Sequence, residues 1–408
     1  MSRGEEMVGN LTVGQFNDSY KPIMDGVGVC VENYTRWLNA KYGTAYAVVP
    51  HVPRYRDDDP FTVVRYPSLP LLIMPPYRLG IPWASPAVGS FLTRTAFSLV
   101  HSHSPFIAGR MAERTARRHG VPHVTTFHTK FREDAHRYLR SDRLVEIFIN
   151  RVIRFYQSCD AVWTPSEATG ATLLDYGFRG EITIAPNGSD IGHPTPEEYA
   201  KYRERGARTT KVPADAFVFL FVGQHRWEKN VELIIRTIGR LNEHDRLSSP
   251  IALVFAGEGY ASDMMRRLAR RVGIGDKTRF LGRIVGRERL KGLYARADLF
   301  FFPSLYDNAP LVMREAAAFR VPAVVAEGSS AAEIITNGKN GFTVPNDPDA
   351  AAQILHRLMD DRGLIARAGA DAAETVYRGW EQIVDWVAGE YLEIIESRRR
   401  RIRRRRDA

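Results

Sequence analysis

Residues 217–230, FVFLFVGQHRWEKN, carry the clearest structural signal in the chain. Residues 217–222 form an unbroken apolar run of Phe, Val and Leu, which predicts a strand buried on both faces of a parallel sheet. Gly223 then permits a tight turn, and the amphipathic segment 230–242 predicts a helix. A buried strand, a glycine turn and a helix form the repeating unit of a doubly wound α/β domain.

The same alternation of short apolar runs with amphipathic segments continues along both halves of the chain. Expected strands in the first half are residues 11–16, 46–50, 63–66, 99–103, 123–127, 161–164 and 182–185. Expected strands in the second half are residues 217–222, 251–256, 279–282, 298–302 and 321–326. We therefore predict an α/β fold of two Rossmann-like doubly wound domains that face each other across a cleft.

The domain boundaries follow from changes in composition. The predicted N-terminal domain spans residues 1–191, and the predicted C-terminal domain spans residues 214–375. Residues 192–213 are polar and charged and contain three prolines, so we interpret them as a linker that holds a short helix. Residues 380–397 predict a last helix whose apolar face packs back on the N-terminal domain, and residues 398–408 form a basic tail.

The composition is typical of a soluble globular protein. Hydrophobic residues make up 44% of the 408 positions and charged residues 25%. No apolar run is long enough to span a bilayer, and Cys30 and Cys159 lack metal or redox spacing, so we expect a cytoplasmic protein. The net charge is +10, but eight arginines lie within residues 398–406, and the rest of the chain carries only about +3. A nearly neutral body argues against a nucleic-acid partner.

Charged side chains follow two predicted strands of the second half. Arg226 and Lys229 come after the strand at 217–222 and lie beside a helix N-terminus, a combination that suits a diphosphate. Asp307 follows the strand at 298–302, and Glu315 comes after seven intervening residues, inside the next helix. Each residue alone has an ordinary explanation as a solvated cation, a helix cap or a surface acid. Together the two carboxylates could accept hydrogen bonds from a hexose and a ribose.

These motifs resemble those of the retaining GT-B glycosyltransferases, the large glycosyltransferase family 4-like group that builds glycolipids, polysaccharides and sucrose from sugar nucleotides. The family's Gly-Arg-x-x-x-Glu-Lys turn is similar to residues 223–229, and its Glu-x7-Glu motif is similar to Asp307 with Glu315. Two positions depart from the family pattern. Gln224 stands where the family has arginine, and Asp307 stands where it has glutamate.

The resemblance implies roles for individual residues. Lys229 and Arg226 would hold the diphosphate of a nucleotide sugar, Glu315 the ribose, and Asp307 the hydroxyls of the donor sugar. Further donor-binding residues implied by the resemblance are Gly257, Gly259, Arg283, Ile284, Asn308, Ala309, Leu311 and Val312. Uridine donors predominate among similar enzymes, so a UDP-sugar is the expected partner.

The first half holds the remaining expected site residues. Gly26 and Gly28 follow the first strand and resemble the family's glycine-rich loop, which reaches the diphosphate, although a lone Gly-x-Gly is a weak signal. His101 and His128 both end predicted strands. We interpret His101 as structural, whereas His128 matches the family's histidine beside the donor sugar. His128 and Asp307 are therefore the expected catalytic residues.

Family resemblance also implies the course of the reaction. The anomeric configuration would be retained, and the departing phosphate would take the proton of the acceptor hydroxyl. No Asp-x-Asp stands at the matching place, so the expected enzyme needs no metal ion or other cofactor. Charge stabilisation at the diphosphate would then come from the protein itself.

The acceptor is expected to be a membrane lipid. Residues 130–156 predict a basic amphipathic helix, and the loop 67–83 is unusually apolar. Together with the arginine tail at residues 398–406, they could seat the protein on an anionic membrane, where each cation contributes about 1 kcal/mol. Residues 17–20, 128–131 and 227–230 are similar to bacterial enzymes that glycosylate diacylglycerol. We therefore expect peripheral binding to the inner face of the plasma membrane. The alternatives are that helix and loop belong to the core, that the acceptor is soluble or a polysaccharide, and that the protein binds sugar nucleotides without catalysis.

Overall fold

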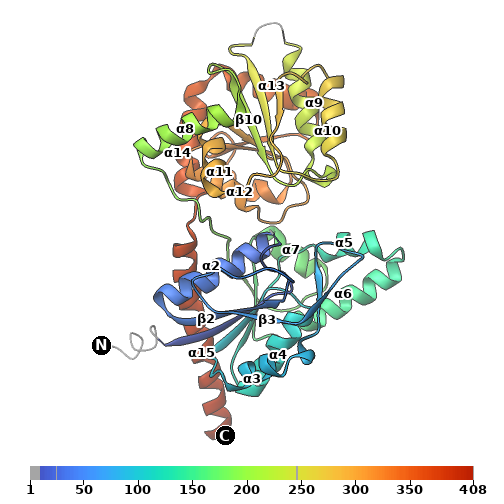
Figure 1. Cartoon of the computed structure of the whole chain (residues 1–408), viewed down its shortest axis with the longest axis vertical. Helices are drawn as coiled ribbons and strands as arrows, with labels where there is room; N and C mark the ends of the chain where they lie inside the picture. Colours follow the sequence, from blue (N-terminus) through green and yellow to red (C-terminus); the bar gives the residue numbers. More distant parts are fainter. Residues whose placement is uncertain (1–9, 24, 245–246, 408) are drawn as a thin grey trace. The chain divides into compact units, whose positions relative to one another are not determined.

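The computed structural model describes residues 10–23, 25–244 and 247–407. The chain divides into two compact units, which we call unit 1 and unit 2. Unit 1 comprises Met1–Gly188 together with Trp380–Ala408, and unit 2 comprises Ser189–Gly379. Figure 1 traces the chain through both units by colour, with the last helix in red returning to the unit that contains the blue strands.

Unit 1 is built on a seven-stranded parallel sheet in the order β3-β2-β1-β6-β7-β8-β9. Val13 of β1 pairs with Ala45 on one side and with Leu99 on the other, and all three are fully buried, as expected for a strand covered on both faces. The strands are β1 Leu11–Phe16, β2 Gly43–Pro50, β3 Val63–Tyr66, β6 Leu99–Ser102, β7 His123–Thr126, β8 Ala161–Thr164 and β9 Ile182–Ile184.

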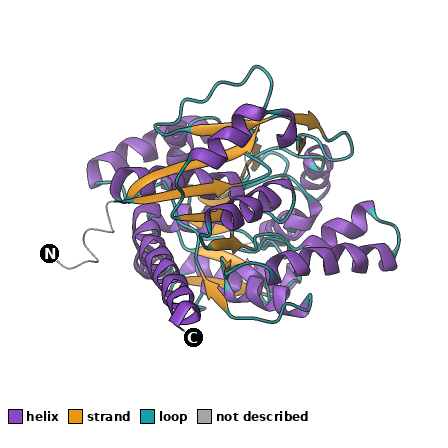
Figure 2. Cartoon of the chain, turned by 90° about the horizontal axis from the view of Figure 1, so that it is seen from below, coloured by secondary structure: helices purple, strands orange, loops and turns teal. Residues whose placement is uncertain are grey.

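Helices cover both faces of this sheet, and Figure 2 shows them surrounding the strands. They are α2 Gly26–Lys41, α3 Pro86–Arg94, α4 Ile107–His119, α5 Phe131–Tyr138, α6 Asp142–Gln157, α7 Glu167–Asp175 and α15 Trp380–Asp407, with a short 3₁₀ helix at Pro82–Ala84. Helices α5 and α6 form a hairpin that projects from the sheet in both views (Figures 1 and 2). Residues 67–83, expected as a loop, contain a small antiparallel ribbon of β4 Ser68–Pro70 and β5 Arg78–Gly80.

The last helix belongs to the core of unit 1. Trp380 and Tyr391 of α15 are fully buried, and α15 packs along α2. Residues 398–408 were expected to form a separate basic tail, but α15 continues without a break to Asp407. The first arginine of this segment is also held in place, because Arg398 pairs with Asp160 at 2.6 Å and donates to the Gly120 carbonyl at 3.1 Å.

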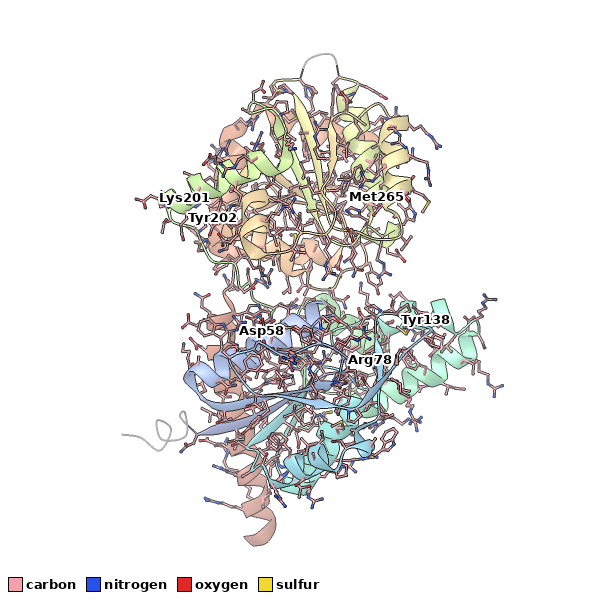
Figure 3. All side chains as sticks on the ribbon, in the orientation of Figure 1. Asp58, Arg78, Tyr138, Lys201, Tyr202 and Met265 are labelled. Atoms are coloured by element: carbon pink, nitrogen blue, oxygen red, sulfur yellow. The ribbon has the colours of Figure 1, made fainter. Side chains whose placement is uncertain are left out.

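Unit 2 repeats the architecture with a six-stranded parallel sheet in the order β12-β11-β10-β13-β14-β15. Its strands are β10 Phe217–Val222, β11 Ile251–Ala256, β12 Thr278–Phe280, β13 Leu299–Phe301, β14 Ala323–Ala326 and β15 Gly341–Val344. Its helices are α8 Pro196–Thr210, α9 Val231–Asn242, α10 Ser262–Arg271, α11 Arg287–Arg296, α12 Leu311–Ala318, α13 Pro348–Asp360 and α14 Arg362–Thr375, with 3₁₀ turns at Trp227–Lys229 and Ser330–Ile334. Met265 of α10, labelled in Figure 3, is one of the side chains that fill the core.

Residues 192–213 are not a free linker. Helix α8 fills most of this segment and packs closely along α11 inside unit 2. The contact relies on small residues, because a Cβ added at Gly206 would lie 2.0 Å from the Gly292 carbonyl oxygen. At the rim, Tyr202 (labelled in Figure 3) accepts from Lys291 and donates to Glu288. Tyr199 and Tyr202 of the same helix pack against Phe319, so the expected short helix is part of the core of unit 2 despite its polar composition.

Each sheet has one position where the chain reverses its direction of progress across the strands. In unit 1 it lies between β1 and β6, and in unit 2 it lies between β10 and β13. We call this position the switch point of the sheet. The loops on its two sides diverge at the carboxyl ends of the strands, which is where doubly wound domains bind ligands. Among the described residues, no helix combines the length and apolar character that crossing a bilayer requires.

The α8–α11 contact yields a stability test. We expect Gly206→Ala to lower the free energy of unfolding by about 1–3 kcal/mol, because the new methyl group would overlap the α11 backbone. Gly389→Ala in α15 is the matched control, since its added Cβ meets nothing within 4 Å and alanine favours a helix by about 0.5–1 kcal/mol. Urea denaturation of both variants measures the difference. Equal stabilities would show that α8 does not pack as described.

Candidate active site

The central feature of unit 2 is an ion pair across its switch point. Lys229, after β10, contacts Asp307, after β13, through Nζ and Oδ1. Ser304 donates its hydroxyl proton to the other oxygen of Asp307 at 2.6 Å. Both side chains of the pair are mostly buried. Two residues that were predicted from separate motifs thus lie side by side at the carboxyl edge of the sheet.

Helix α12 begins directly beyond Asp307 and presents its N-terminus without a side-chain cap. The residue before the helix, Pro310, has no side-chain acceptor, so the N–H groups of Leu311 and Val312 are not held by a cap. The partial positive charge of a helix N-terminus attracts anions. Leu311 and Val312 were predicted as donor-binding residues, and their place at this helix end suits a phosphate or a sugar oxygen.

Glu315 lies one turn into α12 and is buried, so the alternative of an ordinary surface acid is wrong. Tyr294 donates to its Oε2 at 2.8 Å, and Arg287 donates to its Oε1 at 3.2 Å. Arg287 also pairs with Asp190 at 2.7 Å. Burial raises the pKa of Glu315, and the positive charge of Arg287 opposes that shift. No sequence pattern singled out Arg287 or Tyr294, because both come from α11 and meet Glu315 only in the folded chain.

Arg226, the second predicted cation, is engaged within its own loop. Its guanidinium lies 3.4 Å from Glu228 and 5.4 Å from the centre of the Tyr306 ring. Tyr260 donates its hydroxyl proton to the same glutamate. Burial opposes ionisation of Glu228, yet the Tyr260 hydrogen bond and the Arg226 charge lower its pKa to about 2. An incoming phosphate would therefore compete with Glu228 for Arg226.

The predicted glycines of unit 2 hold neighbouring loops together. Gly257 has φ +140°, and a Cβ there would lie 1.9 Å from the Gly223 carbonyl oxygen. A Cβ at Gly259 would lie 2.2 Å from the carbonyl oxygen of His225. These contacts require glycine for backbone packing, whether or not a ligand is bound.

The other predicted positions of this unit lie around the same loops. Arg283 is exposed, and its backbone N–H donates to Glu258 at 3.1 Å, which joins two loops of the site. Ile284 is partly buried against the core. Asn308 and Ala309 lie in the turn between Asp307 and α12. The structure thus gathers the unit 2 predictions in the loops after β10, β11, β12 and β13.

Unit 1 gathers His101, His103 and His128 at the carboxyl ends of β6 and β7, and His123 lies at the start of β7. His103 Nδ1 lies 3.1 Å from His128 Nε2, and the His101 and His103 rings stack at 4.2 Å. Burial lowers the pKa of His128 to about 3 and that of His123 to about 4. Burial also holds the pKa values of His101 and His103 well below 6.5. The four imidazoles are therefore neutral near pH 7.

Gly26 and Gly28 occupy the first turn of α2. The Asp25 carboxylate caps this helix by accepting from the Gly28 N–H at 2.6 Å, and Ser19 donates to its other oxygen at 2.7 Å. A Cβ at Gly28 would lie 3.2 Å from the Asp25 side chain, whereas one at Gly26 would meet nothing within 4 Å. The Gly28 amide is thus committed to the cap, and Gly26 is the open position. Asp25 was not among the predicted site residues, although an Asp before a helix start is a recognisable cap signal.

One group among the described residues has the ligand chemistry of a metal site. The ligand atoms of Cys30, His103 and His128 lie within 4.8 Å of one another. A cation there would have to displace the proton that the two histidines share and ionise a thiol whose pKa burial raises. The residues therefore fit the hydrogen-bonded arrangement better than a metal.

Comparison with known proteins agrees with this geometry. The family model described as glycosyltransferase family 4 matches residues 24–193, and the one described as glycosyl transferases group 1 matches residues 203–375. The D-inositol 3-phosphate glycosyltransferase of Streptomyces griseus is 28% identical over 405 residues, covering 92% of this chain and 83% of the relative. The alpha-monoglucosyldiacylglycerol synthase of Streptococcus pneumoniae is 23% identical over 356 residues, covering 86% and 78%.

A solved structure with the same fold is HepE of Anabaena in complex with UDP and glucose. Its TM-score is 0.72 at 17% identity, over 94% of this chain and 100% of HepE. Two α/β units, each built on a parallel sheet, make up the GT-B fold, as the sequence predicted. The chain belongs to the GT-B glycosyltransferases with family 4-like domains, and it is a transferase.

The buried histidines predict acid sensitivity. In the unfolded chain a histidine takes up a proton below pH 6.5, whereas the folded His123 resists protonation down to about pH 4. Its contribution to stability is therefore full above pH 6.5 and is lost as the pH falls, by about 2 kcal/mol at pH 5. We expect the stability lost in His123→Gln to be smaller at pH 5 than at pH 7.5 by that amount.

Urea denaturation at both pH values measures this difference, with His51→Gln at an exposed position as the control. Burial raises the pKa values of Asp18 and Asp25, so these two carboxyl groups make the folded protein more stable as the pH falls. Both groups are present in the wild-type protein and in the variant, so their effect cancels in the comparison. A penalty for His123→Gln that does not change with pH would contradict burial of a neutral imidazole.

Proposed function

We propose that the protein transfers a hexosyl group from a UDP-sugar to a hydroxyl of a membrane lipid, with retention of the anomeric configuration. The observation that carries the donor side is the placement of Lys229, Asp307 and the uncapped start of α12 at one switch point. HepE, which shares the fold, has been solved with UDP and glucose. A nucleoside diphosphate sugar has the anionic, hydroxyl-bearing chemistry that these groups recognise.

Ligand binding would rearrange the Lys229–Asp307 pair. The diphosphate offers Lys229 a stronger anionic partner, while the hydroxyls of the sugar offer Asp307 new hydrogen-bond donors. Glu315 would keep Arg287 and Tyr294 and accept the ribose hydroxyls with its remaining lone pairs. The site would thereby replace one internal ion pair with two contacts to the donor.

In the proposed reaction, the bond between the anomeric carbon and the phosphate oxygen breaks as the acceptor oxygen bonds to the same face. The departing diphosphate takes the proton of the acceptor hydroxyl, so atoms and charge balance without a protein base. Lys229, Arg226 and the α12 N-terminus would stabilise the charge that develops on the leaving group. With this positive charge supplied by the chain, we expect no requirement for a divalent cation. Neutral His128 would hydrogen-bond the sugar or orient the acceptor.

Lys229→Ala tests the donor site. We expect kcat/KM to fall roughly 10²–10³-fold, because a charge that stabilises the leaving group in the transition state is lost. Lys291→Ala is the matched control, since Lys291 lies in the same unit but pairs with Glu288 and Tyr202 on the α8–α11 surface. Transfer from radiolabelled UDP-hexose gives the rates. A folded Lys229→Ala protein with nearly full activity would refute the proposed site.

A lipid acceptor is supported by the surface of unit 1. Leu72, Ile73 and Trp83, around the β4–β5 ribbon, are 88%, 68% and 72% exposed, which removes the alternative that this loop belongs to the core. Exposed apolar side chains in such a group suit insertion into a lipid surface. The same alternative, that the basic helix belongs to the core, is partly right for α6. Val145 and Ile149 pack in the core, while other positions of the helix face solvent.

The ribbon packs against the start of α4, the helix that carries Arg110. Gly80 of β5 lies against Ile107 at the start of α4, and a Cβ at Gly80 would come within 2.9 Å of it. Arg110, one turn further along α4, lines a depression of about 290 Å³ with Arg151 and Arg154 of α6. A peripheral protein binds an anionic membrane through apolar side chains that insert into the lipid and through cations that attract the headgroups. Unit 1 carries groups of both kinds. The S. pneumoniae relative is itself named for a glycolipid product.

Vesicle sedimentation tests the membrane contact. We expect the double variant Leu72→Ser/Ile73→Ser to lose about tenfold or more in affinity for anionic vesicles, since two exposed apolar side chains no longer insert. Leu174→Ser on α7, a 52% exposed leucine of the same unit, is the control. No binding of the wild-type protein to anionic vesicles would instead favour a soluble acceptor. The S. griseus relative, named for an inositol phosphate, represents that second candidate function.

A further inference from the structure

A continuous chain of hydrogen bonds runs through the interior of unit 1 from His128 to the last helix. His128 Nε2 meets His103 Nδ1 at 3.1 Å, and His103 Nε2 meets Gln15 Oε1 at 2.8 Å. Gln15 Nε2 donates to the Tyr391 oxygen at 3.1 Å, and the Tyr391 oxygen meets His101 Nδ1 at 2.5 Å.

The chain ends where His101 Nε2 meets Thr126 Oγ1 at 2.8 Å. The members between its two ends, from β1, β6 and α15, are at most 3% exposed. Water therefore does not compete for these bonds, and each member depends on its neighbours for hydrogen-bond partners.

The amide of Gln15 fixes the direction of the bonds that link it to Tyr391 on one side and to His103 and His128 on the other. Its Oε1 can only accept, so the proton of His103 must sit on Nε2. A neutral imidazole carries one proton, so His103 Nδ1 is bare and accepts from His128 Nε2–H. On the other side, Gln15 Nε2 donates to the Tyr391 oxygen, which also contacts His101 Nδ1. The three bonds from His128 through His103 and Gln15 to Tyr391 thus all point toward Tyr391.

We propose that Gln15 and Tyr391 are positioning residues that hold His128 in the tautomer with its proton on Nε2 and its lone pair on Nδ1. In this tautomer the Nδ1 atom of His128 can only accept a hydrogen bond, which suits a hydroxyl of the sugar or of the acceptor. The opposite tautomer would donate instead and would favour a phosphate oxygen. This role for His128 rests on the proposed transfer reaction, whereas its tautomer does not.

The tautomer can be read directly by long-range proton–nitrogen NMR on protein with 15N-labelled histidine, which distinguishes a protonated ring nitrogen from a bare one. We expect His128 and His103 to carry their protons on Nε2 at neutral pH. A proton on Nδ1 of His128 in the wild-type protein would overturn the proposal, and this measurement needs no variant.

Tyr391→Phe removes the hydroxyl and keeps the ring that stacks on Trp163 at 5.4 Å. Without this partner the Gln15 amide loses its fixed orientation, so we expect both tautomers at His128. Because neither Gln15 nor Tyr391 lies in the donor site, kcat should fall about tenfold while the KM for the donor stays nearly constant. Gln15→Met, which removes the acceptor of His103, should have the same effects.

Tyr34→Phe is the matched control, because Tyr34 is equally buried and packs on His101 and His103 but bonds Cys30 instead of the chain. Its His128 tautomer and its kcat should equal those of the wild-type protein. An unchanged tautomer in Tyr391→Phe and Gln15→Met would overturn the proposal. A protein with the expected tautomer but without hexosyl transfer would refute the proposed function and leave the positioning role intact.

Discussion

Parallel strands that are covered on both faces constrain everything else in this molecule. Such strands must be apolar on both sides, so polar and charged side chains can gather only where the strands end. Val13 and Leu220 illustrate this point, since each lies in the middle of a sheet and is fully buried. The loops at the carboxyl ends therefore hold the chemistry, and the switch point of each sheet decides which of these loops can share a ligand.

The two units solve the resulting electrostatic problem in different ways. Unit 2 places opposite charges together, as in Lys229 with Asp307 and Arg287 with Glu315, so that each ion has a partner of opposite charge. Unit 1 buries neutral imidazoles, whose pKa values fall because burial disfavours the charged form. A charged ligand would exchange partners in unit 2, whereas unit 1 offers hydrogen bonds of fixed direction.

Sequence patterns predicted most of the fold and part of the site. The apolar runs at 217–222 and 251–256 gave strands within a residue of the observed ones, because burial on both faces leaves an unbroken signal. Strand β15 was missed, since Gly341–Val344 is short and is extended mainly by pairing with β14. The partners of the predicted site residues were missed for a related reason. Gln15, Tyr391 and Arg287 are distant in sequence from the side chains they contact, so only tertiary packing brings them together.

The course of the polypeptide through the two units has a consequence for biosynthesis. Residues 189–379 form a complete unit with its own core, whereas the earlier-made sheet of unit 1 lacks Trp380 and Tyr391 until the end of translation. Domains generally acquire structure in the order in which they leave the ribosome. Here unit 1 emerges first but is the last to complete its core. A chain that stops shortly after Gly379 would therefore have a folded unit 2 and a unit 1 whose core lacks the side chains of the last helix.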